Sequence, residues 1–204
     1  MSKLILASKS PRRLALLREA GIEPIVTAFD TDETITEKLT PEETVVTLAE
    51  RKAEAAKTYL GDDALILSAD TVVALGDTIF GKPKDEQDAD RILHLLSGST
   101  HRVLTGVCVA RGDVTVSAYD CTYIQFNELS DEDIAGYVAT GEPMGKAGAY
   151  AVQENAGHFV KKMDGNYDNV VGLPVGLCAD LIRAAFGLDL YNDFNGERKD
   201  CISE

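Results

Sequence analysis

Apolar and amphipathic segments alternate along most of the chain, and their lengths separate strands from helices. Short apolar or alternating runs predict strands at residues 3–7, 24–29, 65–69, 72–75, 78–80, 103–109, 114–126, 149–153 and 157–163. Longer segments with a helical period or capping residues predict helices at residues 11–20, 41–60, 85–96, 131–140 and 174–186. The clearest is the second helix, where Thr40 and Glu43 form a capping box and Pro41 takes the first helical position.

Strands and helices interleave, but Gly76-Asp77 and Gly112-Asp113 also predict hairpin turns between consecutive strands. Hairpins join antiparallel strands, whereas helical crossovers join parallel ones, so the sheet should be mixed. We therefore predict an α/β fold with helices flanking a mixed central sheet. The length of 204 residues suits a single domain over residues 1–204. Residues 188–204 show no clear period and are expected to form a tail.

The charge of the chain restricts the possible functions more than its overall composition does. The chain has 20 basic and 34 acidic residues, a formal net charge of −14, which argues against a general nucleic-acid binder. A small phosphorylated ligand is still compatible, because one site needs only a few local cations. The apolar runs are too short for a membrane span or a secretory signal, so we expect a cytoplasmic protein without membrane partners. The widely spaced cysteines predict neither a zinc site nor a disulfide framework.

Basic residues occur where a structural role alone does not require them. Arg12 and Arg13 fall in the first turn of a helix, where the helix dipole disfavours cations. They are either solvated or part of an anion site that combines guanidinium groups with backbone N–H groups. Lys52 shares a helical stripe with apolar residues, so it either extends along the core edge to solvent or points its ammonium into a cleft. Lys82 lies between Gly81 and Pro83 in a predicted loop.

Two acidic residues complete the set of candidates. Asp70 follows an apolar strand, at the end of a strand where α/β sheets commonly bind ligands, although an aspartate that simply begins a turn is also common. Glu33 closes an acidic run that is either solvated or supplies an oxygen ligand to a hard cation such as Mg²⁺. Together these cations and carboxylates match the needs of phosphoanhydride cleavage: charge neutralisation, a divalent ion and a carboxylate that activates water. A Walker motif and an isolated G-x-G-x-x-G are both missing, which disfavours a P-loop NTPase or a Rossmann dehydrogenase.

Several short motifs along the chain resemble those of the Maf family of nucleotide pyrophosphatases and occur in the same order. They are LASKSPRR at residues 6–13, ADTVV at residues 69–73, GKP at residues 81–83, LSG at residues 96–98 with His101 and Thr105-Gly106, GKAGAYAVQ at residues 145–153 and NVVGLP at residues 169–174. The resemblance implies an elongated fold like that of the inosine triphosphatases, with two lobes and a cleft. It also implies hydrolysis of a nucleoside triphosphate to the monophosphate and pyrophosphate with Mg²⁺ or Mn²⁺.

Roles for individual residues follow from the same resemblance. Asp70 would be the catalytic carboxylate, acting as a general base or orienting a metal-bound water. Glu33 would be catalytic or metal-associated, so that Asp70 and Glu33 are the candidate metal ligands. The residues expected to bind or neutralise the phosphates are Ser8, Arg13, Lys52 and Lys82.

Three positions concern the choice of base. Arg12, Thr71 and Gln153 resemble the subgroup that acts on dTTP and UTP, and the amide of Gln153 can both donate to and accept from the edge of uracil or thymine. The alternatives are the subgroup that acts on 7-methyl-GTP and a nucleotide-binding regulator of cell division without catalysis. A homodimer is a further expectation. The chain departs from the family pattern at Lys9, where a small or uncharged residue is more common, and at residues 154–158, where the family has a glycine-rich turn.

Overall fold

The computed structural model describes residues 3–195 of the chain. Its helices and strands follow one another as β1 (Leu4–Ala7), α1 (Pro11–Glu19), β2 (Ile25–Thr27), α2 (Pro41–Leu60), β3 (Leu65–Leu75), β4 (Thr78–Phe80), α3 (Glu86–Leu96), β5 (Thr100–Arg111), β6 (Val114–Phe126), α4 (Asp131–Ala139), the 3₁₀ helices η1 (Ala147–Ala149) and η2 (Asn155–Phe159), β7 (Val160–Asp164), α5 (Tyr167–Val171), α6 (Val175–Phe186) and α7 (Leu190–Asp193). No helix in this part of the chain is long and apolar enough to span a membrane.

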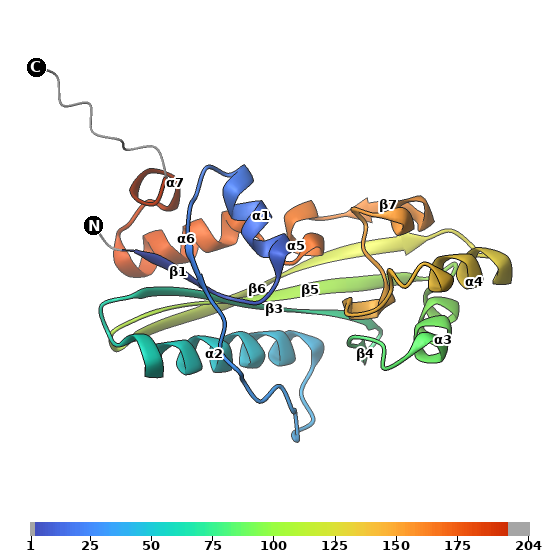
Figure 1. Cartoon of the computed structure of the whole chain (residues 1–204), viewed down its shortest axis with the longest axis horizontal. Coiled ribbons are helices and arrows are strands. Elements are labelled where there is room, and N and C mark those ends of the chain that lie inside the picture. Colours follow the sequence, from blue (N-terminus) through green and yellow to red (C-terminus); the bar gives the residue numbers. More distant parts are fainter. Residues whose placement is uncertain (1–2, 196–204) are drawn as a thin grey trace, which may run out of the picture.

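The strands form one mixed sheet in the order β2-β1-β3-β5-β6-β7, with β4 also paired to β3. Strand β1 lies parallel to β2 and β3, whereas the β3–β5, β5–β6 and β6–β7 pairs are antiparallel. The predicted hairpins account for the β3–β4 and β5–β6 pairs. The predicted α/β fold with a mixed sheet is therefore confirmed (Figure 1).

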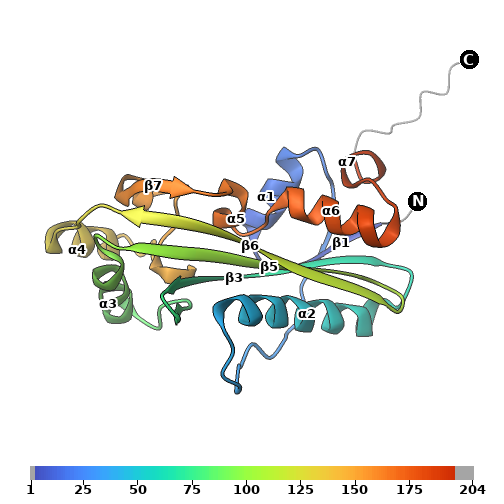
Figure 2. The ribbon, with the colours of Figure 1, turned by 180° about the vertical axis from the view of Figure 1, so that it is seen from behind.

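Helices cover both faces of the long strands β3, β5 and β6, which run along the length of the molecule (Figures 1 and 2). Helices α1 and α6 pack on one face, and α2 packs on the other. Separate hydrophobic clusters form at the two ends of the sheet, one beneath α1 and α6 and one between α3, α4 and β7. The long strands link these ends through their backbone hydrogen bonds.

Helix α2 begins and ends as the sequence predicts, because its signals are local. The Thr40 hydroxyl accepts a hydrogen bond from the Glu43 N–H, and the Glu43 carboxylate accepts one from the Thr40 N–H. The helix approaches β5 closely at Gly106, where an added Cβ would lie 2.3 Å from the Val45 carbonyl oxygen. Only glycine permits this contact, so Gly106 sets the height of α2 above the sheet.

Strand β3 continues past the predicted end at Ala69 and runs to Leu75, so Asp70 lies within the strand. The expectation that Asp70 ends a strand is therefore wrong. One edge of β3 pairs with β1 up to Leu67 and with β4 from Val73 onward. Among the described residues, no strand covers that edge between Leu67 and Val73. Asp70 therefore lies at a gap in the sheet edge.

Two further expectations are corrected. Residues 149–153 form no strand: Ala149 is the last residue of η1, and its φ of 62°, like the 68° of Gly148, is incompatible with a strand. Residues 188–195 are not a loose tail, because Leu190 in α7 and Phe194 are buried against the core. The remaining part of the expected tail, residues 196–204, lies outside the described residues. The short helix α5 was not predicted, and the strand expected at residues 157–163 is β7, preceded by η2.

Candidate active site

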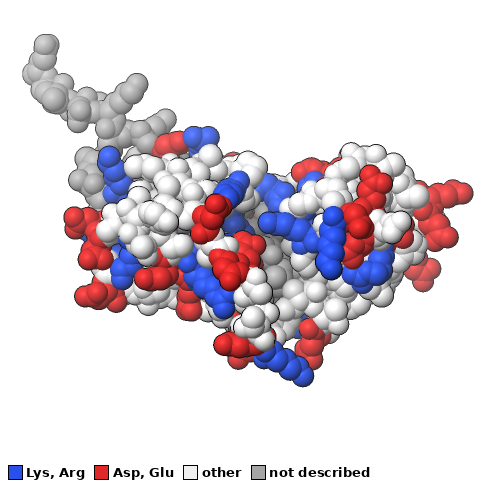
Figure 3. Space-filling model, turned by 60° about the horizontal axis from the view of Figure 1, so that its bottom comes forward, with Lys and Arg blue, Asp and Glu red and all other residues white. Residues whose placement is uncertain are grey.

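A cavity of about 530 Å³ opens beside the gap in the sheet edge. Its walls come from the start of α1, the loop after β2, the middle of β3 and the loops around residues 82, 145–153 and 170–172. The surface is hollowed between two bulges of the molecule, and Lys and Arg side chains gather around the hollow (Figure 3). Every predicted site residue lines this one cavity: Ser8, Arg12, Arg13, Glu33, Lys52, Asp70, Thr71, Lys82 and Gln153.

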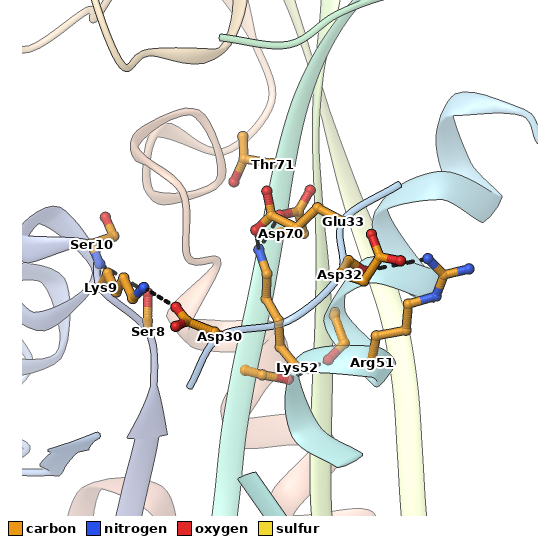
Figure 4. Close-up of polar contacts among 12 residues, drawn as sticks. Ser8, Lys9, Ser10, Asp30, Asp32, Glu33, Arg51, Lys52, Asp70 and Thr71 are labelled. Atoms are coloured by element: carbon orange, nitrogen blue, oxygen red, sulfur yellow. Dashed lines mark hydrogen bonds and ion pairs between the residues drawn. The ribbon is translucent and has the colours of Figure 1, made fainter. Parts of the chain in front are cut away.

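Lys52 lies between two carboxylates. Its Nζ is 2.5 Å from Asp70 Oδ1 and 2.7 Å from Glu33 Oε1 (Figure 4). The Lys52 and Asp70 side chains are only 16% and 13% exposed, whereas that of Glu33 is 51% exposed. Of the alternatives for Lys52, the structure therefore selects the ammonium that points into a cleft.

The charges around Glu33 favour its ionised form. Partial burial by itself raises the pKa of Glu33, but the hydrogen bond and charge of Lys52 outweigh it and hold the pKa below the ordinary value. The charges of Lys82 and Arg13 act in the same direction. Lys82 is exposed and makes no hydrogen bond or ion pair with another described residue, so its ammonium remains available to a ligand.

Arg13 is held on three sides. Its Nε donates to the Gly172 carbonyl oxygen at 2.8 Å, its Nη1 to Ser8 Oγ at 3.2 Å and its Nη2 to Thr71 Oγ1 at 3.1 Å. Burial lowers the pKa of this guanidinium, with Asp70 opposing the shift, but an arginine remains protonated in proteins. A guanidinium has five N–H bonds, so two of them remain for a ligand. Gly172, with a φ of +123°, allows the chain to pass this close, because an added Cβ would lie 3.3 Å from Thr71 Oγ1.

The Ser8 hydroxyl can only donate towards the cavity. Its oxygen already accepts hydrogen bonds from the Ser10 N–H at 3.1 Å and from Arg13 Nη1 at 3.2 Å. Both lone pairs are therefore used, and the proton is left to donate. Ser8, Arg13 and the first turn of α1 thus present hydrogen-bond donors to the same space, which is the arrangement that binds an anion.

The loop between β2 and α2 brings Glu33 to this site, and contacts on both sides of Glu33 hold it. Arg51 Nη1 donates to the carbonyl oxygens of Thr34 at 2.8 Å and Asp32 at 3.4 Å. Lys9 forms an ion pair with Asp30 at 2.6 Å, in which both side chains are largely exposed (Figure 4). The unusual lysine at position 9 therefore contacts this loop, at the mouth of the cavity.

Gln153 also lines the cavity, directly before the segment of residues 154–158 that departs from the family pattern. In place of a glycine-rich turn, the segment continues into η2 and is fixed by side chains. Lys146 is buried and pairs with Glu154 at 2.9 Å, and the Glu142 carboxylate accepts from Asn155 Nδ2 at 2.7 Å. Gln153 itself is exposed and free of these contacts.

Tyr150 forms a buried part of the same wall. Its hydroxyl lies 2.7 Å from Nε2 of His101, which is 1% exposed. Burial lowers the pKa of His101 to about 4, so the imidazole is neutral at pH 7. This histidine therefore supports the wall of the cavity and adds no charge to it.

Sequence reasoning assigned no role to Arg51 or Gly172, and it gave Thr105 none beyond its place in a motif. The contact of Arg51 depends on the path of a loop, which no local pattern indicates. Gly172 lies in the NVVGLP motif, but helix α5 before it was not predicted, so the sequence did not mark this glycine as the residue after a helix, where a positive φ is common. The roles assigned to the predicted site residues remain predictions, although their positions around one cavity agree with them.

Comparisons with known proteins agree with the motifs. The family described as "Maf-like protein" matches residues 3–185. A protein of Pelotomaculum thermopropionicum named dTTP/UTP pyrophosphatase is 46% identical over 185 residues, covering 90% of this chain and 96% of the relative. A protein of Rhodopseudomonas palustris with the same name is 50% identical over 181 residues, covering 85% and 87%.

Among solved structures, a HAM1 protein from Coxiella burnetii aligns with a TM-score of 0.49 and 15% identity, covering 91% of this chain and 100% of that one. A Ham1 protein from Staphylococcus aureus aligns with a TM-score of 0.46 and 14% identity, covering 61% and 72%. The family match spans most of the chain, and the relatives align over nearly their full length. The chain therefore belongs to the Maf family.

Proposed function

We propose that this protein hydrolyses dTTP and UTP to the nucleoside monophosphate and pyrophosphate. The observation that carries the proposal is the arrangement of Lys52 between Asp70 and Glu33, beside a group of hydrogen-bond donors. The names of relatives at 46% and 50% identity support the same reaction.

The phosphates would bind at the start of α1. There the Ser8 proton, the two remaining N–H bonds of Arg13 and the dipole of α1 all favour an anion. The exposed ammonium of Lys82 adds a further cation to the lining of the cavity. This local positive charge explains how a chain with a net charge of −14 can bind a triphosphate.

Asp70 would activate the water. Lys52 holds Oδ1 of Asp70, which leaves Oδ2 to accept a hydrogen bond and then the proton from a water molecule. The oxygen of that water forms a bond to the α-phosphorus, and the bond from this phosphorus to the bridging oxygen breaks. Pyrophosphate leaves with the electron pair of that bond, and Arg13 and Lys82 stabilise its charge.

The carboxylates also fit a divalent cation. Mg²⁺ commonly binds through one or two carboxylates together with substrate phosphates; Glu33 keeps an oxygen that does not contact Lys52, and Oδ2 of Asp70 has a second lone pair besides the one that faces the water. We therefore propose that these two residues hold Mg²⁺ or Mn²⁺ when the nucleotide is bound. The ion would neutralise phosphate charge and lower the pKa of a bound water.

The base would lie towards Gln153 and Arg12. The exposed amide of Gln153 offers both a donor and an acceptor, which complements the O4 and N3–H groups of thymine and uracil. Such a site disfavours a base whose donors and acceptors are exchanged, as in cytosine.

Two further proposals concern the protein as a whole. Because its proposed substrate is a free nucleotide, we place the protein in the cytoplasm. We also propose a homodimer, which analytical ultracentrifugation would detect.

Pyrophosphate release from a panel of nucleotides tests the proposal. We expect turnover of dTTP and UTP with Mg²⁺ or Mn²⁺, and a loss of at least about a hundredfold in Asp70→Asn, the size typical of a lost general base. Asp113→Asn, an exposed aspartate in the β5–β6 turn, is the matched control. Preferential turnover of 7-methyl-GTP would support the alternative specificity. Tight nucleotide binding without any turnover would instead support the non-catalytic regulator and contradict the proposal.

A further inference from the structure

Two threonine hydroxyls meet behind Arg13. Thr71 on β3 and Thr105 on β5 are directly paired in the sheet, and their hydroxyl oxygens lie 2.9 Å apart. Thr105 is fully buried, whereas Thr71 lies at the edge of the cavity. The pair therefore connects the core to the wall of the active site.

The direction of this hydrogen bond follows from the number of protons. The Thr105 hydroxyl donates to the Asn169 carbonyl oxygen at 2.9 Å, because a carbonyl can only accept. A hydroxyl has one proton, so Thr105 must accept in its contact with Thr71. Thr71 therefore donates to Thr105, and towards the cavity it can only accept.

The group that Thr71 accepts from is Arg13. Nη2 of Arg13 lies 3.1 Å from Thr71 Oγ1. If the Thr71 proton pointed at Arg13 instead, a donor would face a donor and the contact would be repulsive. Thr105 therefore fixes the orientation in which Thr71 can hold the guanidinium.

The far end of this chain of hydrogen bonds is rigid. Asn169 is fully buried, and its side-chain Nδ2 donates to the Val103 carbonyl oxygen and to Thr122 Oγ1, both at 2.9 Å. These bonds fix the position of the Asn169 backbone, which carries the carbonyl that Thr105 contacts. Arg13 is thereby linked to the centre of the sheet.

We propose that Thr105 is a positioning residue for phosphate binding, which acts by fixing Thr71 in the orientation that holds Arg13. The inference rests on the phosphate-binding role of Arg13 in the proposed function. It predicts that removal of the Thr105 hydroxyl weakens binding of the phosphates whichever base the nucleotide carries.

The test is the affinity of Thr105→Val for inorganic pyrophosphate, measured by calorimetry. Valine keeps the shape of threonine but removes the hydroxyl. We expect the Kd for pyrophosphate to rise about tenfold, the scale of a hydrogen bond to a charged group. The KM values for dTTP and UTP should rise by the same factor, and Thr105→Ser should restore all three.

Thr44→Val is the matched control, because Thr44 is also buried and its hydroxyl donates to the Thr40 carbonyl oxygen at 2.8 Å, outside the hydrogen bonds that lead to Arg13. It should lower the melting temperature as Thr105→Val does, but leave the Kd for pyrophosphate unchanged. Combined with Arg13→Lys, Thr105→Val should have no further effect on this Kd. Equal effects of the two valine variants on the Kd would overturn the proposal, as would an effect on dTTP that UTP does not share.

If Thr105→Val does not fold, Thr71→Val and Thr71→Ser provide the same comparison at a less buried position. A normal Kd for pyrophosphate in a folded Thr71→Val would also overturn the proposal. Binding of pyrophosphate does not require turnover, so the two proposals fail separately. A wild type that binds pyrophosphate as expected but hydrolyses no nucleotide contradicts only the proposed function.

Discussion

Lys52 offers the most direct test of the electrostatics of the site. Its Nζ contacts Asp70 at 2.5 Å and Glu33 at 2.7 Å, so one ammonium separates two carboxylates. The substitution Lys52→Met keeps an unbranched side chain and removes the charge. The carboxylates then face each other without a cation between them, and we expect the folded state to lose stability at neutral pH.

The size of the loss follows from their separation. Because both oxygens contact the same nitrogen, the carboxylates lie roughly 5 Å apart, and at an effective dielectric constant of about 20 their repulsion is about 3 kcal/mol. The Glu33 side chain is 51% exposed, so solvent screens much of this energy. We therefore expect Lys52→Met to lower the free energy of unfolding by about 1–2 kcal/mol at pH 7.

The loss should depend on pH in a definite direction. The pKa of Glu33 is held below its ordinary value in the folded state, chiefly by Lys52 acting against partial burial. Stability from this contact is therefore present above the ordinary glutamate pKa of about 4.3, and it is lost as the pH falls through the lowered pKa. Urea unfolding should show a larger difference between wild type and variant at pH 7 than near pH 3.5, because Glu33 becomes protonated as the pH falls.

Lys57→Met, in the last turn of the same helix, is the control and should cost little at either pH. A ¹³C titration of the carboxyl groups should also show a higher pKa for Glu33 in Lys52→Met than in the wild type. The reasoning is refuted if Lys52→Met loses the same free energy at both pH values, or if the pKa of Glu33 does not change.

Three further predictions concern the frame around the site. Gly106→Ala should lower the free energy of unfolding, measured in urea, by at least about 2 kcal/mol, because its Cβ would lie 2.3 Å from the α2 backbone. Gly136→Ala is the control at an open position in α4, and it should be neutral or stabilising by up to about 1 kcal/mol. Gly172→Ala should cost about 1–3 kcal/mol in thermal unfolding, since its φ is +123°, and should raise the KM for dTTP by displacing Arg13. Because burial lowers the pKa of His101 to about 4, the wild type should lose up to about 3 kcal/mol of stability between about pH 6.5 and pH 4, and His101→Gln should flatten this dependence in urea unfolding. Unchanged slopes or midpoints in these variants would contradict the packing and burial on which they rest.

The elements that local sequence predicted well are those that local contacts stabilise. Helix α2 matches its prediction because the capping box of Thr40 and Glu43 and the proline after it act within one turn. The end of β3 was misplaced, because the polar residue Asp70 interrupts an apolar run although the strand pairs with β5 through Ala74. The burial of Phe194 had no local signal, since it depends on contact with distant parts of the core.

The residues of the candidate site also divide into those that local sequence indicates and those whose contacts depend on the fold. The position of Lys52 on an apolar stripe and of Arg13 in a first helical turn already marked them as unusual, and the motifs identified the remaining residues. The contact of Arg51 with the carbonyls beside Glu33 and that of Thr105 with Thr71 depend on a loop path and on strand register. Neither property is encoded within a short stretch of sequence.

The gap in the edge of β3 has a consequence for how the family could change its substrates. The interval from Leu67, where β1 stops, to Val73, where β4 starts, is about 20 Å at the usual rise of a strand. The length of the cavity along β3 is therefore set by where two neighbouring strands end. Insertions or deletions that extend or shorten β1 or β4 would alter the length of ligand that fits, while substitutions in the walls would alter only its chemistry. Strand length and side-chain identity are thus separate variables for evolution or engineering at this site.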